Sequence, residues 1–191
     1  MTKTALLTVG STQFPSLVSA VLSPLFISQL ASSLDITTLY AQIGHSSLPD
    51  GFSMDKRTVE GVSVEVVRFT NDLEERVGQS DLVISHAGAG SILSFLRPLP
   101  NSQSTSKKGK QRQLILVPND TLMDSHQSDL ADEMKKKGWA KICRDPRYLR
   151  RSIEELARHR TLKSTTKSDN EFPELDEKKV QRILDETLAY V

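Results

Sequence analysis

The chain has 191 residues, of which 25 are basic and 24 acidic, so its formal net charge is only +1. A general nucleic-acid binder would carry a basic excess or a basic stripe, and this balance argues against that class. The single cysteine, Cys143, excludes an intramolecular disulfide and a multi-cysteine zinc site, and it favours a reducing compartment.

No membrane-targeting segment is expected. The first ten residues have too short an apolar core for a signal peptide, and residues 17–31, the most apolar long stretch, are too short and too polar to span a bilayer. We therefore expect a soluble domain with a substantial core, and any membrane contact to be peripheral or through a partner.

The beginning of the chain predicts a strand followed by a broken helix. Residues 4–9 form an apolar strand that ends in a loop of small and hydroxyl residues, Gly10-Ser11-Thr12. Pro15 suits the first turn of the next helix, and Ser23-Pro24 is expected to break that helix and to restart it, with Ser23 as the new cap. The loop has two interpretations, a phosphate-facing turn or an ordinary helix cap, and its residues alone favour the cap.

Two further strands are expected over residues 36–43 and 62–67. Between them, a polar loop with the turn sequence Pro49-Asp50-Gly51 is expected over residues 45–56. A short helix over 72–77 follows, and Gly78 is expected to end it.

A glycine-containing turn follows the next strand. The β-branched apolar run at residues 82–84 is typical of a buried strand. The chain then turns through Gly88 and Gly90, and Ser91 is a good N-cap for a helix over 92–96. Glycines let the backbone approach a ligand closely, and the free N–H groups of a first helical turn attract anions. The stretch therefore predicts a diphosphate site.

The same stretch has a simpler interpretation, an ordinary strand-to-helix turn. Leu93 stands where a dinucleotide fingerprint would have its third glycine, and no Gly-Lys-Ser/Thr ending marks a P-loop. His86 has an equally plain alternative, a histidine whose hydrogen bonds are satisfied at a strand end. A second polar stretch, residues 120–127, favours the functional interpretation.

The rest of the chain continues the alternation of strands and helices. Residues 98–112 interrupt it with a polar, lysine-rich insertion, which a solvated loop explains better than contact with anionic lipid. The elements expected after it are a strand at 114–117, a helix at 124–137, a strand at 139–143 and a helix at 148–158. We divide the chain into a domain at 1–160, a linker at 161–172 and a C-terminal helix at 173–191.

Strands that alternate with helices indicate an α/β fold with a mostly parallel, doubly wound sheet. Ligands of such sheets lie outside the carboxyl ends of the strands. Polar or glycine-rich junctions at residues 10–12, 86–91 and 119–127 all fall at those ends, which packing alone does not explain.

These junctions carry a family resemblance. The sequence Asp-Leu-Val-Ile-Ser-His-Ala-Gly-Ala-Gly-Ser-Ile at 81–92 and the sequence Pro-Asn-Asp-Thr-Leu-Met-Asp-Ser-His-Gln at 118–127 resemble the C-terminal, donor-binding half of GT-B nucleotide-sugar transferases of glycosyltransferase family 28. They are most like the soluble donor subunit found in dolichol-linked oligosaccharide synthesis. Residues 9–14, 172–173 and 183–187 also fit, and the departure is the insertion at 98–112. The resemblance implies a single Rossmann-like domain.

The resemblance also implies a reaction and its partners. The chain would bind UDP-GlcNAc, without a cofactor or a metal ion. It would add the second N-acetylglucosamine to dolichyl-diphospho-GlcNAc in β1,4 linkage, with inversion. It would act with a membrane-anchored acceptor-binding subunit, to which the helix at 173–191 would dock. That partner would hold it, as a cytoplasmic protein, at the cytosolic face of the endoplasmic reticulum. Neither nucleic acid nor a membrane span of its own is expected.

The resemblance assigns two groups of site residues. Those that would contact or border the donor phosphates are Ser11, Thr12, His86, Gly88, Gly90 and Ser91, and Gly10, Ala89 and Asn119 are also expected to bind the donor. Those that would bind sugar hydroxyls are Asp124, His126 and Gln127; carboxylates accept from hydroxyls, and an amide both accepts and donates. Asp124 also fits a plain helix cap. The catalytic base stays open, because Asp124, His86, His126 and a base on the acceptor half all suit the chemistry.

Two other functions fit part of the sequence. One is a nucleotide-sugar-binding regulatory or scaffold subunit whose chemistry takes place elsewhere. The other is a nicotinamide-dependent oxidoreductase, against which the missing third glycine and the lack of a clear ribose-binding acidic residue argue.

Overall fold

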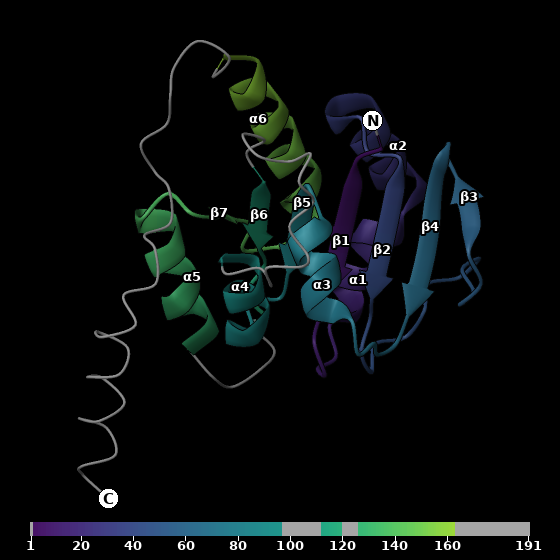
Figure 1. The fold of residues 1–191 in the computed structure, drawn as a ribbon, viewed down its shortest axis with the longest axis horizontal. Helices are drawn as coiled ribbons and strands as arrows, with labels where there is room; N and C mark the ends of the chain where they lie inside the picture. The colour runs from purple at the N-terminus through teal and green to yellow at the C-terminus, as the bar shows by residue number, and fades with distance from the viewer. Residues whose placement is uncertain (1, 97–111, 120–125, 163–191) are drawn as a thin grey trace, which may run out of the picture.

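A mostly parallel sheet forms the centre of the molecule (Figure 1). The computed structural model describes residues 2–96, 112–119 and 126–162, with the backbone alone for 126–129 and 159–162. Within these ranges the sheet has seven strands in the order β3-β4-β2-β1-β5-β6-β7. The strands are β1 (Thr4–Thr8), β2 (Thr38–Gln42), β3 (Arg57–Val59), β4 (Val62–Val67), β5 (Leu82–Ser85), β6 (Gln113–Leu116) and β7 (Lys141–Ile142).

The order of the strands reverses beside β1. The chain runs outward from β1 through β2 to β4, then returns to β5 on the other side of β1 and continues through β6 to β7. All described pairings are parallel except that of β3 with β4. The α/β, mostly parallel fold expected from the sequence is therefore confirmed. A doubly wound sheet binds its ligands at such a reversal, here between the carboxyl ends of β1 and β5.

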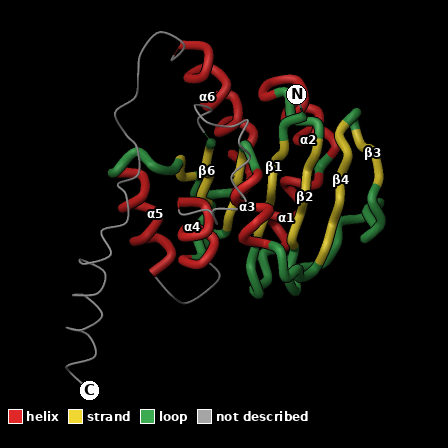
Figure 2. Tube along the Cα trace, viewed as in Figure 1, coloured by secondary structure: helices red, strands yellow, loops and turns green. Residues whose placement is uncertain are grey.

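Helices cover both faces of the sheet (Figures 1 and 2). One face packs against α1 (Pro15–Leu22), α2 (Pro24–Leu34) and α6 (Leu149–Leu162), which the short helix η3 (Pro146–Tyr148) precedes. The other face packs against α3 (Leu73–Gln79), α4 (Ala89–Leu96) and α5 (His126–Lys136). Along β1, Leu6 and Leu7 therefore enter different clusters, and both are fully buried. Burial on both sides explains why the central strands are continuous apolar runs.

The break between α1 and α2 is where the sequence predicts it. Pro24 begins α2, and the hydroxyl of Ser23 accepts a hydrogen bond from the N–H of Phe26 at 3.3 Å. Among the described residues, no single helix is long and apolar enough to cross a membrane. The two helices α1 and α2 reach that length and composition only together, and they are bent by 60°.

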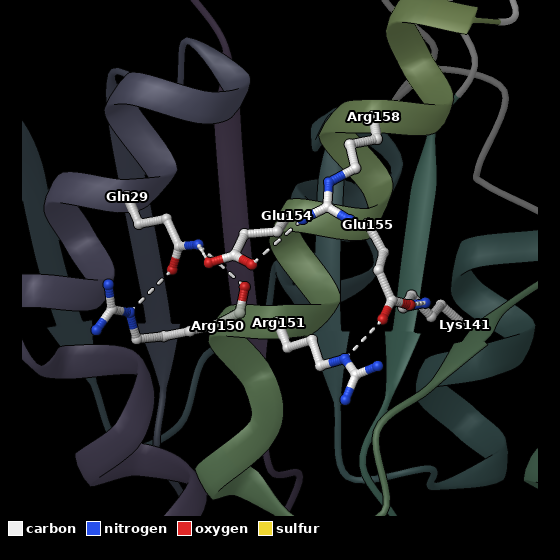
Figure 3. A network of polar contacts seen from close by, with 7 residues as sticks. All are labelled: Gln29, Lys141, Arg150, Arg151, Glu154, Glu155 and Arg158. Carbon is white, nitrogen blue, oxygen red and sulfur yellow. Dashed lines mark hydrogen bonds and ion pairs between the residues drawn. The ribbon is translucent and has the colours of Figure 1, made fainter.

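A polar network fastens α6 to its neighbours (Figure 3). The amide of Gln29 on α2 donates to the carbonyl oxygen of Arg150 at 3.0 Å and accepts from Nε of the same residue at 3.2 Å. Glu155 accepts from Arg151 at 3.1 Å and pairs with Lys141 of β7. The network therefore joins α6 to β7, which precedes it in the chain, and to α2, about 120 residues earlier.

Two local expectations are wrong, and one element is missed. Gly78 does not end α3, which continues to Gln79 and buries Gly78, because tertiary packing outweighs a helix penalty of about 1 kcal/mol. Ser91 is not an N-cap, because α4 begins at Ala89 and Ser91 is its third residue. Residues 57–59, for which the sequence predicts no element, form the edge strand β3, which a tight turn at Glu60-Gly61 pairs with β4.

Other expectations fall outside the described residues. They are the helix start at Asp124, nearly all of the insertion at 98–112 and the helix at 173–191. The helix expected at 148–158 runs on to Leu162, into the range that the sequence predicts as linker.

Candidate functional site

Two loops meet where the strand order reverses. Residues 9–12 follow β1, and residues 86–88 follow β5, its parallel neighbour. In the first loop, the N–H and the hydroxyl of Thr12 both donate to the carbonyl of Val9, at 3.3 and 2.8 Å. Gly10 has φ +61°, a left-handed conformation that an L side chain rarely adopts. The first loop is therefore a tight turn with the exposed Ser11 at its tip.

His86 lies between the two loops. Only 6% of its surface is exposed, and its Nδ1 lies 3.3 Å from the carbonyl oxygen of Thr8. A carbonyl only accepts, so Nδ1 carries the proton and the neutral ring presents Nε2 as an acceptor. A Cβ built on Gly10 would lie 2.9 Å from Cε1 of this ring, and one on Gly88 only 2.6 Å from it. Both glycines therefore make room for the imidazole.

Burial keeps His86 neutral. Desolvation lowers the pKa of His86 below its usual value of 6.5, and the hydrogen bond to the Thr8 carbonyl offsets part of that effect. A neutral Nε2 suits a hydroxyl donor or a proton that is to be abstracted.

The N-terminus of α4 opens toward solvent beside His86. Ala87 turns the chain with φ 65°, a strained conformation for a non-glycine residue of the kind that recurs at functional sites. The first bond within the helix runs from the N–H of Ile92 to the carbonyl of Gly88 at 3.1 Å. The N–H groups of Ala89, Gly90 and Ser91 precede it and have no acceptor within the helix. Together with the helix dipole, they form a suitable site for an anion.

The third predicted loop joins this site through Asn119. This buried residue follows β6, and its Nδ2 donates to the carbonyl of Gln13 at 3.0 Å, across 106 residues. The structure thus brings together the loops at 10–12, 86–91 and 119. Asp124 lies outside the described residues, and for His126 and Gln127 only the helical backbone at the start of α5 is described.

Sequence reasoning missed polar and aromatic residues at the same edge. Gln42, the last residue of β2, is buried and hydrogen-bonded to Gly10. His45 and Phe69, beyond the ends of β2 and β4, form an edge-on aromatic pair with ring centroids 5.0 Å apart. The signal for Gln42 is a polar residue within the mostly apolar run at residues 39–43. The signal for Phe69 is an aromatic residue just past a strand end, and 52% of its surface is exposed.

The comparisons with known proteins identify the family. Residues 4–183 match the C-terminal domain of glycosyltransferase family 28. The chain belongs to this family. A protein of Cryptococcus neoformans var. neoformans serotype D, UDP-N-acetylglucosamine transferase subunit ALG13, is 37% identical to it, with 98% of this chain and 97% of that protein covered. The human protein of the same name is 36% identical over 74% of this chain, but only 11% of the human protein is covered.

Solved structures of glycosyltransferases share the family 28 fold. A glycotransferase of kitacinnamycin superposes with a TM-score of 0.52 and 22% identity, covering 84% of this chain and 36% of that one. MurG of Acinetobacter baumannii gives a TM-score of 0.50 and 18% identity, covering 82% and 41%. This chain therefore has the fold of one half of a GT-B enzyme, and it spans about two fifths of the solved chains that it matches.

Proposed function

We propose that this family 28 chain is the UDP-GlcNAc-binding, catalytic subunit of an inverting N-acetylglucosaminyltransferase. It would add the second N-acetylglucosamine to dolichyl-diphospho-GlcNAc, together with a membrane-anchored subunit that binds the acceptor at the cytosolic face of the endoplasmic reticulum. The relatives that are named as subunits of a UDP-N-acetylglucosamine transferase support the donor and the need for a partner. The observation that carries the proposal is the open N-terminus of α4 at the strand reversal, beside the Gly10–His86–Gly88 contact.

The chain's own groups suit the departure of a nucleotide diphosphate. The N–H groups of Ala89, Gly90 and Ser91, reinforced by the dipole of α4, would stabilise the negative charge that develops on the leaving diphosphate. These donors are already oriented by the helix, so they cost no reorganisation during the reaction. An α-linked donor that gives a β product requires attack from the opposite face, in a single displacement.

His86 would act at the border of the diphosphate. With Nδ1–H bound to Thr8, its Nε2 would accept a hydrogen bond from a sugar or acceptor hydroxyl. This geometry makes His86 a candidate for the base, beside Asp124, His126 and a residue of the acceptor half.

The proposal is tested with the Gly90→Asp variant, co-expressed with the membrane subunit. Gly90 is exposed and has no atom within 4 Å of a built Cβ, so the fold tolerates a side chain there. The added carboxylate would block and repel the diphosphate. We expect transfer of labelled GlcNAc from UDP-GlcNAc to the lipid acceptor to be lost, while co-purification with the partner is kept.

Ser94→Asp is the matched control, since it adds the same charge one turn further along α4. We expect it to retain transfer. Full transfer by Gly90→Asp would place the donor site elsewhere. A chain whose partner complex never transfers GlcNAc, although it binds UDP, would instead be the regulatory subunit.

A further inference from the structure

Gln42 uses every hydrogen-bonding position of its side chain. Its Oε1 accepts from the hydroxyl of Thr8 at 2.6 Å and from the N–H of Gly10 at 3.0 Å. Its Nε2 donates to the carbonyl oxygens of Gly10 at 2.8 Å and of Arg68 at 2.6 Å. Only 2% of Gln42 is exposed, so these four bonds form away from water. A buried polar group of this kind fixes its surroundings only while all its partners are present.

The partners of Gln42 lie at the carboxyl ends of three strands. Thr8 ends β1 and Gly10 lies two residues beyond it, Gln42 itself ends β2, and Arg68 follows β4. Gly10 is held at both its N–H and its carbonyl, which fixes the left-handed turn that packs against the ring of His86. The carbonyl of Thr8, in turn, is the acceptor for Nδ1 of His86. The amide of Gln42 therefore acts on the site by holding the segment Thr8–Gly10, and it does so without contacting the ligand.

We infer that Gln42 is a positioning residue for nucleotide-sugar binding, because its amide holds the Gly10 loop in the shape that the diphosphate requires. The inference rests on the proposed function. Binding is tighter when the loop is already ordered in the free protein, because no conformational entropy is then lost in ordering it on binding. A Gln42 variant that still folds should therefore bind UDP more weakly.

The plain alternative is that Gln42 only ties the sheet together. Gln29 provides a matched control for it, because this second glutamine also joins separate elements through its amide and is 9% exposed. Gln29 lies in the α2–α6 network shown in Figure 3. Its helix ends at Leu34, whose carbonyl accepts from Lys3 at the opposite edge of the sheet from the loops of the site.

The experiment compares Gln42→Glu with Gln29→Glu in the full chain. A carboxylate at position 42 keeps the acceptor for Thr8 and Gly10 but loses both donations, to Gly10 and to Arg68. Thr8→Val is a second variant, which removes the hydroxyl that donates to Oε1 of Gln42 at 2.6 Å and accepts from the N–H of Gly10 at 3.2 Å, while both donations from Gln42 are kept. UDP affinity is measured by titration calorimetry at 10 °C, thermal stability by circular dichroism, and KM for UDP-GlcNAc with the partner subunit present.

We expect both glutamine variants to lower the melting temperature. Only Gln42→Glu should lower the affinity for UDP at least tenfold, and it should raise KM for UDP-GlcNAc more than it lowers kcat. Thr8→Val should lower the affinity for UDP by a smaller factor. Unchanged UDP affinity in folded Gln42→Glu or Thr8→Val, with tight binding by the unaltered chain, overturns the positioning role alone. If the unaltered chain and its partner complex both fail to bind UDP, the proposed function falls and this inference with it.

Discussion

The imidazole of His86 occupies the space that a side chain on Gly88 would need, with its Cε1 only 2.6 Å from the position of such a Cβ. Gly90, two residues further on, has no atom within 4 Å of a built Cβ. The two glycines that predict a diphosphate site in the sequence therefore have different roles. Gly88 makes room for the histidine, and Gly90 leaves the first turn of α4 open to a ligand.

Gly88→Ala should displace the ring of His86, whereas Gly90→Ala should leave the fold unchanged. Displacement breaks the bond from Nδ1 to Thr8 and forces a packed loop to move, at a cost of about 1–3 kcal/mol. Alanine at position 90 sits in a helix and should stabilise the chain by up to about 1 kcal/mol. Urea denaturation of both variants measures the difference. Equal stabilities would show that His86 does not depend on Gly88 for its space.

The stability of the fold should depend on pH through His86. Burial lowers the pKa of His86 in the folded chain, while the unfolded chain has the usual value of about 6.5. Below pH 6.5 the unfolded state therefore binds a proton at His86 that the folded state does not bind. The free energy of unfolding accordingly falls as the pH drops from 6.5 toward the folded pKa.

Melting temperatures between pH 8 and pH 5.5 check this expectation. The carboxyl groups Asp72 and Glu155, whose pKa values are lowered by Thr70 and Lys141 respectively, titrate below that window. His86→Gln should flatten the profile, and the difference between the two curves isolates His86 from the other histidines. Identical slopes in both proteins would contradict a neutral, buried His86.

The sequence predicts the central strands and the loops of the site well, because both have local signals. The β-branched run before His86 and the Ser23-Pro24 break need no distant partner to be recognised. The misses depend on packing. Gly78 stays helical because that turn is buried, and Ser91 is not a cap because Ala87 completes the turn two residues before α4.

The role of Gln42 shows why part of the site is invisible to local patterns. Its partners Gly10 and Arg68 are 32 and 26 residues away in the chain, and only the parallel register of β1, β2 and β4 brings them together. A polar residue among apolar strand residues indicates that it has a hydrogen-bond partner, but the identity of that partner depends on the fold.

Phe69→Ala should weaken the binding of uridine nucleotides while leaving the fold intact. The ring is half exposed, lies at the same edge as the anion site and is three strand spacings from β5, roughly 14 Å. Stacking of a base on such a ring contributes about 1–3 kcal/mol. We expect calorimetry to give UDP affinities at least fivefold lower for Phe69→Ala and near the original for Phe69→Tyr. Equal affinities for the three proteins would show that the uracil base does not stack on Phe69.

Arg112 ends the insertion and fastens two helices at the edge opposite the site. Its guanidinium donates to the carbonyl oxygens of Ser80 at 3.1 Å and Phe95 at 3.0 Å, and also to that of Val77. It also lies 4.3 Å from the ring centroid of Phe95. Burial lowers the pKa of Arg112 to about 10, so the group is still charged at neutral pH. The residue therefore caps the C-terminal ends of both α3 and α4.

Arg112→Met should destabilise the fold by about 2 kcal/mol, because it leaves partly buried carbonyl groups without donors. Arg112→Lys should recover only part of the loss, since a single ammonium cannot span the acceptors that the planar fork reaches. Urea midpoints measure both. Arg144→Met is the matched control, because Arg144 pairs with Asp132 at an exposed site, where an ion pair contributes less than about 1 kcal/mol. If Arg112→Met and Arg144→Met shifted the midpoint equally, Arg112 would be an ordinary surface arginine and not a cap for α4.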